Sequence, residues 1–125
     1  MNTDKIIHAG LTEVIIGSAM TVLNKLRPGL NERAYENALV IELAKRQVPT
    51  QQQKRFQVLY DGIVVDTLVP DLIVHDQVIV DPKVVDDFTP SHVAQMIGYL
   101  AITGLSVALL LNFKFSDLRW RRIVR

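Results

Sequence analysis

Residues 69–85, VPDLIVHDQVIVDPKVV, place charged side chains inside a run of β-branched residues. Valine and isoleucine at this density are typical of strands, and His75-Asp76 divides the run as a tight turn does. We therefore expect two antiparallel strands, one ending near Val74 and one covering about 77–85. Strands of this kind hide apolar side chains, so this segment requires a sheet with a well-covered core.

The rest of the chain predicts helices that can cover this sheet. Along the sequence, the spacing of apolar residues changes from a helical period to the alternation of strands and back to a helical period. The expected elements are helices at 12–26 and 30–46, strands at 56–60, 63–74 and 77–85, a helix at 89–103, and strands at 105–112 and 119–124. Thr12 and Thr89 are the expected N-caps. The order αα-βββ-α-β(β) predicts an α/β fold, a mixed β-sheet flanked by helices, in one domain over residues 1–125.

Composition excludes several classes of protein. The chain has no cysteine, which excludes a disulfide framework, a thiolate nucleophile and a cysteine-type zinc site. The start lacks a basic segment followed by a sustained apolar run, and the longest apolar run, 105–111, is too short to span a bilayer. We therefore expect a cytoplasmic protein with no membrane partner. Seven Asp and one Lys lie in 61–87, whereas five cations lie in 114–125, a distribution compatible with a metal site inside a polyanion-binding surface or with ordinary solvated charge.

The charged residues of the first segment fall into one group. Asp81 and Lys83 are two residues apart and share a face of their strand, and a turn at 75–76 places Asp71 opposite residue 80 or 81. Two carboxylates this close repel unless a cation intervenes, and a hard divalent ion such as Mg²⁺ prefers such oxygens. The alternative is a turn residue and a weak surface ion pair, but the apolar surroundings favour a functional role.

Two helices offer further polar residues. Glu32 opens the second helix in line with the inward stripe of Tyr35, and its alternative role is a favourable charge in a first helical turn. On the third helix, Gln95 and Tyr99 continue a polar line from His92. That line either faces solvent or faces the site.

These residues form recognisable motifs. GLNERAY (29–35) matches GxxExxY, PD (70–71) with DPK (81–83) matches PD-(D/E)xK, and QMIGY (95–99) matches QxxxY. Each motif is weak alone, but their order and spacing are specific. The chain resembles the GxxExxY proteins of the PD-(D/E)xK nuclease superfamily, which includes RecB-like members with the QxxxY motif, over nearly its whole length.

The resemblance implies a restriction-endonuclease-like core and a metal-dependent nuclease. Asp71 and Asp81 would hold Mg²⁺ or Mn²⁺, Glu32 would complete or support the metal site, and Lys83 would serve the attacking water. The glutamine and tyrosine of QxxxY would position the site or a phosphate. The implied reaction is phosphodiester hydrolysis in DNA, with RNA as the alternative polyanion. A homodimer would supply one site for each strand of a duplex.

The chain departs from the family at Asp81, where relatives typically carry Glu, and at Pro82, where they carry an apolar residue. Proline donates no ladder hydrogen bond, so Pro82 predicts a bulge or an edge position. The competing hypothesis is therefore a catalytically inert nuclease-like domain that binds nucleic acid or a protein; a plain structural protein leaves the charges unexplained.

The C-terminal segment offers a second group of cations. Arg119, Arg121 and Arg122 are available for phosphate contacts, and Trp120 is available for stacking on a base. The alternatives are a solvated arginine face and a tryptophan that anchors the core.

Overall fold

The computed structural model describes residues 8–125. The sequence analysis expected no signal peptide at the start of the chain, and residues 1–7 of that segment lie outside the described part. The elements are α1 (Ala9–Leu26), α2 (Glu32–Lys45), β1 (Thr50–Gln52), β2 (Phe56–Tyr60), β3 (Ile63–Leu68), β4 (Leu72–Val74), β5 (Val78–Lys83), α3 (Pro90–Thr103), β6 (Val107–Asn112) and β7 (Arg119–Val124). Within residues 8–125, no helix combines the length and hydropathy needed to cross a bilayer.

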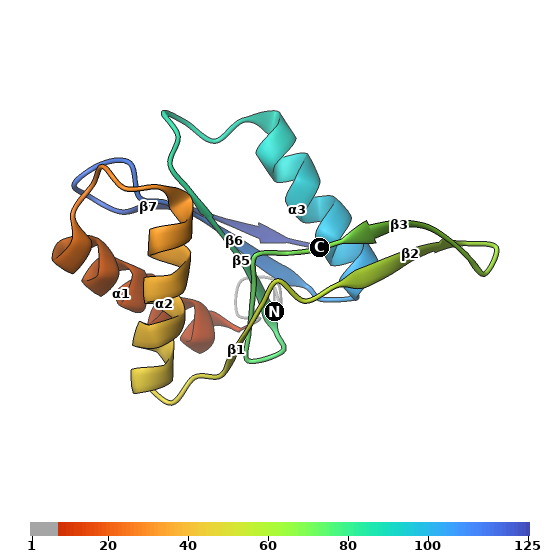
Figure 1. Ribbon diagram of the computed structural model, residues 1–125, viewed down its shortest axis with the longest axis horizontal. Coiled ribbons are helices and arrows are strands. Elements are labelled where there is room, and N and C mark those ends of the chain that lie inside the picture. Colours follow the sequence, from red (N-terminus) through yellow and green to blue (C-terminus); the bar gives the residue numbers. More distant parts are fainter. Residues whose placement is uncertain (1–7) are drawn as a thin grey trace, which may run out of the picture.

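Five strands form a mixed sheet in the order β1-β4-β5-β6-β7. The pairing of β5 with β6 is parallel, and the other pairings are antiparallel. Helices α1 and α2 cover one face of this sheet and α3 covers the other (Figure 1). The predicted mixed sheet with helices on its faces is therefore confirmed.

Alternation along β5 decides which face each side chain occupies. Val78 and Val80 pack into the core beneath α1 and α2, whereas Ile79 packs into the core beneath α3. Because successive side chains on a strand point to opposite faces, Asp81 and Lys83 belong to the α3 face. The sheet thus presents its charged residues to the side on which α3 lies.

The predicted strand 63–74 is wrong as a single element. It divides at residues 69–71 into β3 and β4, and β2 pairs with β3 in a separate two-stranded sheet. Pro70 explains the division, because a proline donates no hydrogen bond to a ladder. The expectation that all of these strands belong to one mixed sheet is therefore also wrong for β2 and β3. The strand that pairs with β4 on its outer side is β1, a short strand that the sequence did not predict.

The first two helices begin at other residues than predicted, and α2 begins at Glu32 and not at residue 30. Helix α1 begins at Ala9 and not at Thr12, whose hydroxyl donates to the Ala9 carbonyl from within the first turn. Helix α3 follows the prediction. Thr89 caps it, the Thr89 hydroxyl accepting from the His92 amide while His92 Nδ1 accepts from the Thr89 amide. His92 is thereby committed to the cap and does not extend the line of Gln95 into the site.

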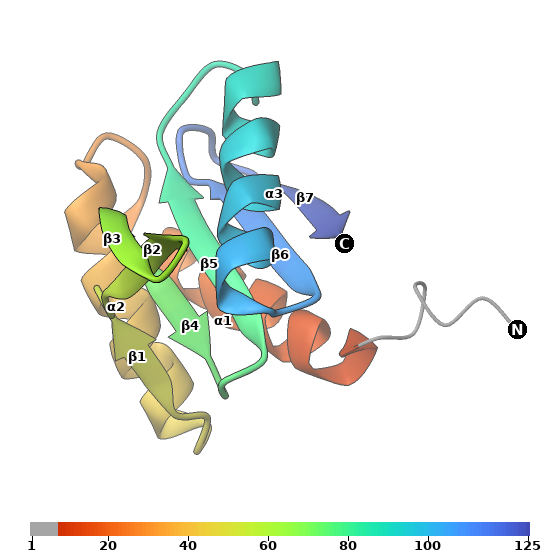
Figure 2. The same cartoon turned by 90° about the vertical axis from the view of Figure 1, so that its right-hand side faces the viewer.

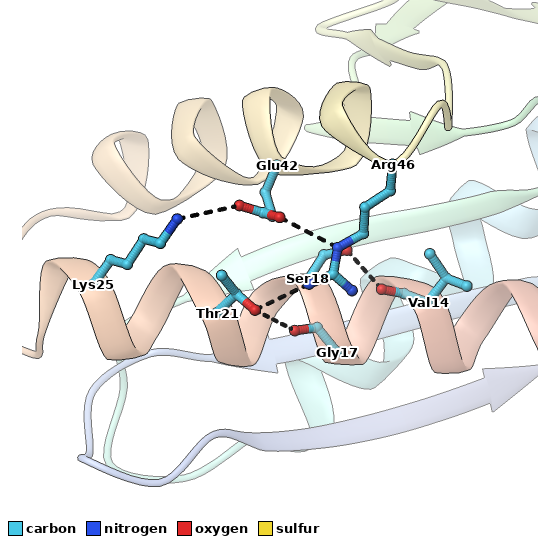
Figure 3. Close-up of polar contacts among 7 residues, drawn as sticks. All are labelled: Val14, Gly17, Ser18, Thr21, Lys25, Glu42 and Arg46. Atoms are coloured by element: carbon cyan, nitrogen blue, oxygen red, sulfur yellow. Dashed lines mark hydrogen bonds and ion pairs between the residues drawn. The ribbon is translucent and has the colours of Figure 1, made fainter.

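Polar contacts join α1 to α2 on their outer side (Figure 3). Arg46 donates to Thr21 Oγ1 at 3.0 Å, and its Nε lies 3.3 Å from Glu42 Oε2. Lys25 Nζ lies 3.9 Å from Glu42 Oε1. A Cβ at Gly17 would meet the Arg46 guanidinium at 3.4 Å, which is an ordinary van der Waals distance, so this arginine lies directly over α1. These contacts fix the helix pair that carries Glu32.

The turn between the two helices is tied to α2 by a buried tyrosine. Tyr35 donates from its hydroxyl to the Arg27 carbonyl at 2.7 Å and accepts from the Leu30 amide at 3.2 Å. Its ring stacks on Phe113 with centroids 4.7 Å apart. Arg27 itself has φ 68° and ψ 163°, a backbone region that belongs almost entirely to glycine.

Candidate functional site

The two aspartates of the PD and DPK motifs lie opposite each other at one end of the sheet. Leu72 pairs with Val80 in the β4–β5 ladder, and one further step in the same register places Asp71 opposite Asp81. Pro70 is buried directly before Asp71 and ends the extended run of β3. The sequence prediction that Asp71 faces residue 80 or 81 is therefore consistent with the observed register.

Asp81 is a buried carboxylate with an incomplete set of partners. Only 4% of the residue is exposed, and its Oδ2 lies 3.2 Å from Lys83 Nζ. Its Oδ1 has no hydrogen-bond partner in the part of the chain that the structure describes. Burial, reinforced by the adjacent Asp71 carboxyl and opposed by Lys83, raises the pKa of Asp81 to about 7. The arrangement therefore favours a proton or a cation between the carboxyl groups.

Pro82 occupies β5 without disturbing it. The register between β5 and β6 is continuous from Val78 to Lys83, so the predicted bulge is absent from this ladder. Strand β4 pairs with β5 only as far as Val80, which leaves Pro82 with a strand on one side alone. The predicted edge position is thus confirmed, and it explains how a proline is tolerated in this strand.

The acidic residue of α2 that is linked to Asp71 is Glu36. Gln53 Nε2 donates to Glu36 Oε2 at 3.1 Å and to Asp71 Oδ1 at 3.2 Å. Gln52 Nε2 also donates to Glu36, at 2.9 Å. Glu36 is 3% exposed. Neither Glu36 nor Gln53 was identified from the sequence; the only available signal was a second glutamate one helical turn after Glu32, whereas Gln53 gave none.

Glu32 lies at the entrance of the same site. It is exposed, and its Oε1 accepts from the Val84 amide at 3.2 Å. This contact ties the first turn of α2 to the chain that leaves β5. A cavity of about 520 Å³ opens here. It is lined by Leu30, Asn31, Glu32, Arg33, Glu36, Asp71 and Val84.

Helix α3 brings Gln95 and Tyr99 to the other side of the carboxylates. Gln95 Nε2 donates to the Tyr99 hydroxyl at 3.1 Å. Burial raises the pKa of Tyr99, and the negative charges of Asp81 and Asp71 raise it further, while Lys83 opposes them. The structure thus brings the QxxxY residues within electrostatic range of both aspartates.

Asn112 is a positioning residue that the sequence analysis did not identify. It is 2% exposed and lies at the end of β6. Its Nδ2 donates to the Val85 carbonyl at 2.8 Å, and its Oδ1 accepts from the amides of Val85 and Lys114 at 3.3 and 3.1 Å. Asn112 therefore fixes the path of the chain just after Lys83.

The arginines of β7 do not act as one group. Register places Arg119 beside Asn112 and Arg121 beside Leu110, on the face that carries Lys83 and Asp81 two strands away, at roughly 10 Å. Arg119 lies over the Phe115 ring at 4.0 Å, with its Nε 3.6 Å from Asp117 Oδ2.

The other two candidate residues of β7, Trp120 and Arg122, lie on the opposite face of the sheet. Arg122 pairs with Leu109 and belongs to the opposite face of the sheet, so it is not grouped with Arg121. Trp120 is 45% exposed, so its interpretation as a core anchor is wrong.

The donor set fits a divalent cation held partly by water. No group of three or more His, Asp or Glu side chains able to hold a metal ion occurs within residues 8–125. Asp71 and Asp81 nevertheless provide two facing carboxylates, one of them with the unpartnered buried Oδ1. Mg²⁺ commonly takes one or two protein carboxylates and completes its shell with water and substrate phosphate. These residues therefore suit such an ion.

Comparison with known proteins adds one finding. The family model described as the PD-(D/E)XK nuclease superfamily matches residues 9–123. Comparisons with curated proteins and with solved structures gave no match.

Proposed function

Because the chain belongs to the PD-(D/E)XK nuclease superfamily, we propose that it is a metal-dependent nuclease that hydrolyses phosphodiester bonds in DNA. Its mixed five-stranded sheet with flanking helices is consistent with a restriction-endonuclease-like fold. The observation that carries the proposal is the convergence of Asp71, Asp81 and Lys83 at one end of the sheet, beside an open cavity.

Each residue has a role that its contacts support. Asp71 and Asp81 would hold Mg²⁺ or Mn²⁺, which when bound stabilises charge on the phosphate and lowers the pKa of a bound water. Gln53 holds Asp71 in place, and Lys83 is held by Asp81 in position to orient the attacking water. Glu36 supports Asp71 through Gln53, so we assign it the helix-borne role that the motif gives to Glu32.

The substrate would approach through the cavity at the start of α2. Glu32 sits on its rim and keeps the chain after β5 in place. Gln95 and Tyr99 would position a phosphate from the α3 side, and the exposed Arg119 and Arg121 would contact the backbone further along the sheet. DNA is the proposed substrate, and RNA is the alternative that the same phosphate chemistry allows.

The catalytic proposal is preferred to the inert one because the residue that prompted the inert hypothesis is accommodated. Pro82 lies in continuous register with β6, and Lys83 and Asp81 on either side of it form their ion pair. Asp81 has a shorter side chain than the glutamate that is usual at this position. Its carboxyl group nevertheless lies close to that of Asp71 on the neighbouring strand. Both departures from the family pattern are therefore compatible with a working site.

We further infer membership of the GxxExxY family, a single domain over residues 1–125 and a cytoplasmic location. The motif residues support the first inference: Gly29 has φ 115°, Glu32 binds the chain after β5, and Tyr35 ties the interhelical turn. The main sheet draws strands from residue 50 to residue 124, which supports one domain.

Calorimetric titration with Mn²⁺ tests the metal site before any substrate is chosen. The parent should bind about one ion per chain, and Asp71→Asn should lose that binding while remaining folded. Asp76→Asn is the matched control, since Asp76 is exposed in the turn of the same strand pair. Equal binding by the parent and Asp71→Asn would refute the assignment.

Cleavage of labelled single-stranded and duplex DNA in Mn²⁺ tests the reaction. Lys83→Met should retain the metal but lose on the order of a hundredfold in rate, because the side chain that orients the water is absent. Lys114→Met is the control, because Lys114 is an exposed cation paired with Asp86 in the neighbouring loop. Equal cleavage by the parent and Lys83→Met would refute the proposed role of Lys83.

A further inference from the structure

The β2–β3 hairpin extends away from the body of the molecule (Figures 1 and 2). It forms its own two-stranded sheet and carries large apolar side chains that are between 49% and 69% exposed. These are Leu59, Tyr60, Ile63, Val64 and Val65, which we call the hairpin tip. Nothing in the proposed nuclease site uses them.

The hairpin tip is apolar on both of its faces. Tyr60 pairs with Ile63 and Leu59 pairs with Val64, and consecutive pairs point to opposite faces of a ribbon. A shift in register between Val58 and Leu59 interrupts the ladder at this point. A hairpin that covered its own core would be apolar on one face only, so this tip has the character of an interaction site.

The outer side of α3 offers a surface of the right kind. No Asp, Glu, Lys or Arg occurs in this helix. Its exposed residues recur at the spacing that normally faces a core, namely Ala94, Ile97, Gly98, Ala101 and Ile102, which we call the helix face. Phe56 at the base of the hairpin packs against the core cluster that contains Met96 and Leu100, so the hairpin is anchored on the buried side of α3 and leaves the helix face open.

Charge decides which class of partner fits. Residues 56–68 carry Asp61 and Asp66 and contain neither Lys nor Arg. Phosphate groups of nucleic acid and of anionic lipid would repel this hairpin. The helix face of α3 carries no charge and would not repel the acidic hairpin. A second copy of this chain, which presents the same helix face, is therefore the partner that the charges favour.

We propose that two copies of this chain associate through these surfaces, the hairpin tip of each copy packing on the helix face of the other. This exchange is the self-complementary arrangement that a two-fold axis requires. Ile97 and Ile102, at 50% and 40% exposed, join the five side chains of the tip. At roughly 100 Å² for each, seven side chains present about 700 Å² per copy. Two copies thus bury at most about 1,400 Å², which lies within the range of about 1,200–2,000 Å² in total that specific interfaces bury.

Sedimentation velocity on the full chain, from about 1 to 100 µM, tests the proposal. The parent should sediment as a dimer at the upper concentrations. Ile63→Lys in the tip and Ile97→Glu in the helix face should each weaken the dimer by about a hundredfold or more, because each buries an unpaired charge twice per interface. Gln57→Glu and Ser91→Glu, exposed on the same two elements, are the matched controls and should leave it intact.

Mixing the two defective variants tests the pairing of tip with helix face. A mixed dimer contains one unaltered contact and one contact in which the two introduced charges, which have opposite signs, face each other. The mixture should therefore dimerise although neither variant does so alone. Hairpin-to-hairpin pairing predicts no rescue, since the unaltered contact would not exist.

Three results would overturn the proposal. They are a monomeric parent throughout the range, a dimer that survives both substitutions, and a mixture that fails to dimerise. Binding of the parent to phosphatidylcholine–phosphatidylglycerol vesicles, lost in Ile63→Lys while the dimer persists, would assign the tip to lipid instead. The proposal does not depend on catalysis, so a dimer without nuclease activity would leave it standing.

Discussion

The stability of the metal-free protein should fall as the pH rises from about 4 to about 7. Asp81 is buried and its folded-state pKa is about 7, whereas its ordinary value is 3.8. Between these values the folded chain holds a proton that the unfolded chain has released, so folding weakens with increasing pH. The difference between a pKa of 3.8 and one of about 7 corresponds to about 4 kcal/mol of stability, at 1.36 kcal/mol for each tenfold change in acidity.

Asp81→Asn should remove most of this pH dependence, because its side chain holds no titrating proton. The assay is urea unfolding in EDTA at a series of pH values, with the free energy of unfolding plotted against pH. Losing the ion pair with Lys83 changes the absolute stability, so the slopes of parent and variant are the quantities compared. The parent should lose about 4 kcal/mol more than the variant across this interval.

The same substitution at an exposed carboxylate supplies the control. Asp76 has φ 56° in the turn between β4 and β5, a conformation that asparagine tolerates well. Asp76→Asn should therefore follow the pH profile of the parent. The reasoning is refuted if Asp81→Asn retains the slope of the parent, or if the parent becomes more stable as the pH rises through this interval.

Three further substitutions test the supports of the site. Arg27→Gly should stabilise the chain by about 1 kcal/mol in urea unfolding, since glycine relieves the backbone at φ 68°, whereas Arg33→Gly in α2 should destabilise it. Tyr35→Phe should cost about 1–3 kcal/mol in the same assay through its two lost hydrogen bonds; an unchanged midpoint would contradict their importance. Asn112→Ala should speed hydrogen exchange at the Val85 amide, and unchanged exchange there would show that Asn112 is dispensable.

Local patterns predicted the parts of the fold that local chemistry decides. The Thr89 cap depends on residues within one turn of α3, and the facing of Asp71 and Asp81 depends on a turn at 75–76. Both follow from short stretches of sequence. The burial of β6 on both faces was also predicted from the sequence, because a continuous apolar strand requires cover on both faces.

The features that the sequence missed depend on contacts between distant segments. A glutamate in a helix is ordinarily solvated, but Glu36 is buried and accepts hydrogen bonds from Gln52 at the end of β1 and from Gln53, the next residue. Strand β1 is three residues long and is stabilised by its pairing with β4. The separation of β3 from β4 was signalled by Pro70, but the strong β-branched pattern on both sides concealed it.

Because β5 pairs in parallel with β6, the surroundings of Asp81 can form only after β6 has been synthesised. Asp81 lies on β5, and its ladder partner Leu110 is separated from it by the whole of α3. A ribosome must therefore release the chain through β6 before this carboxylate acquires its final neighbours, and non-local pairing of this kind is slow to form. The turn at 75–76 can bring Asp71 opposite Asp81 once β5 has been made, but Asp81 remains hydrated until β6 pairs with β5. In the proposed nuclease, the candidate metal site would accordingly be completed late in synthesis.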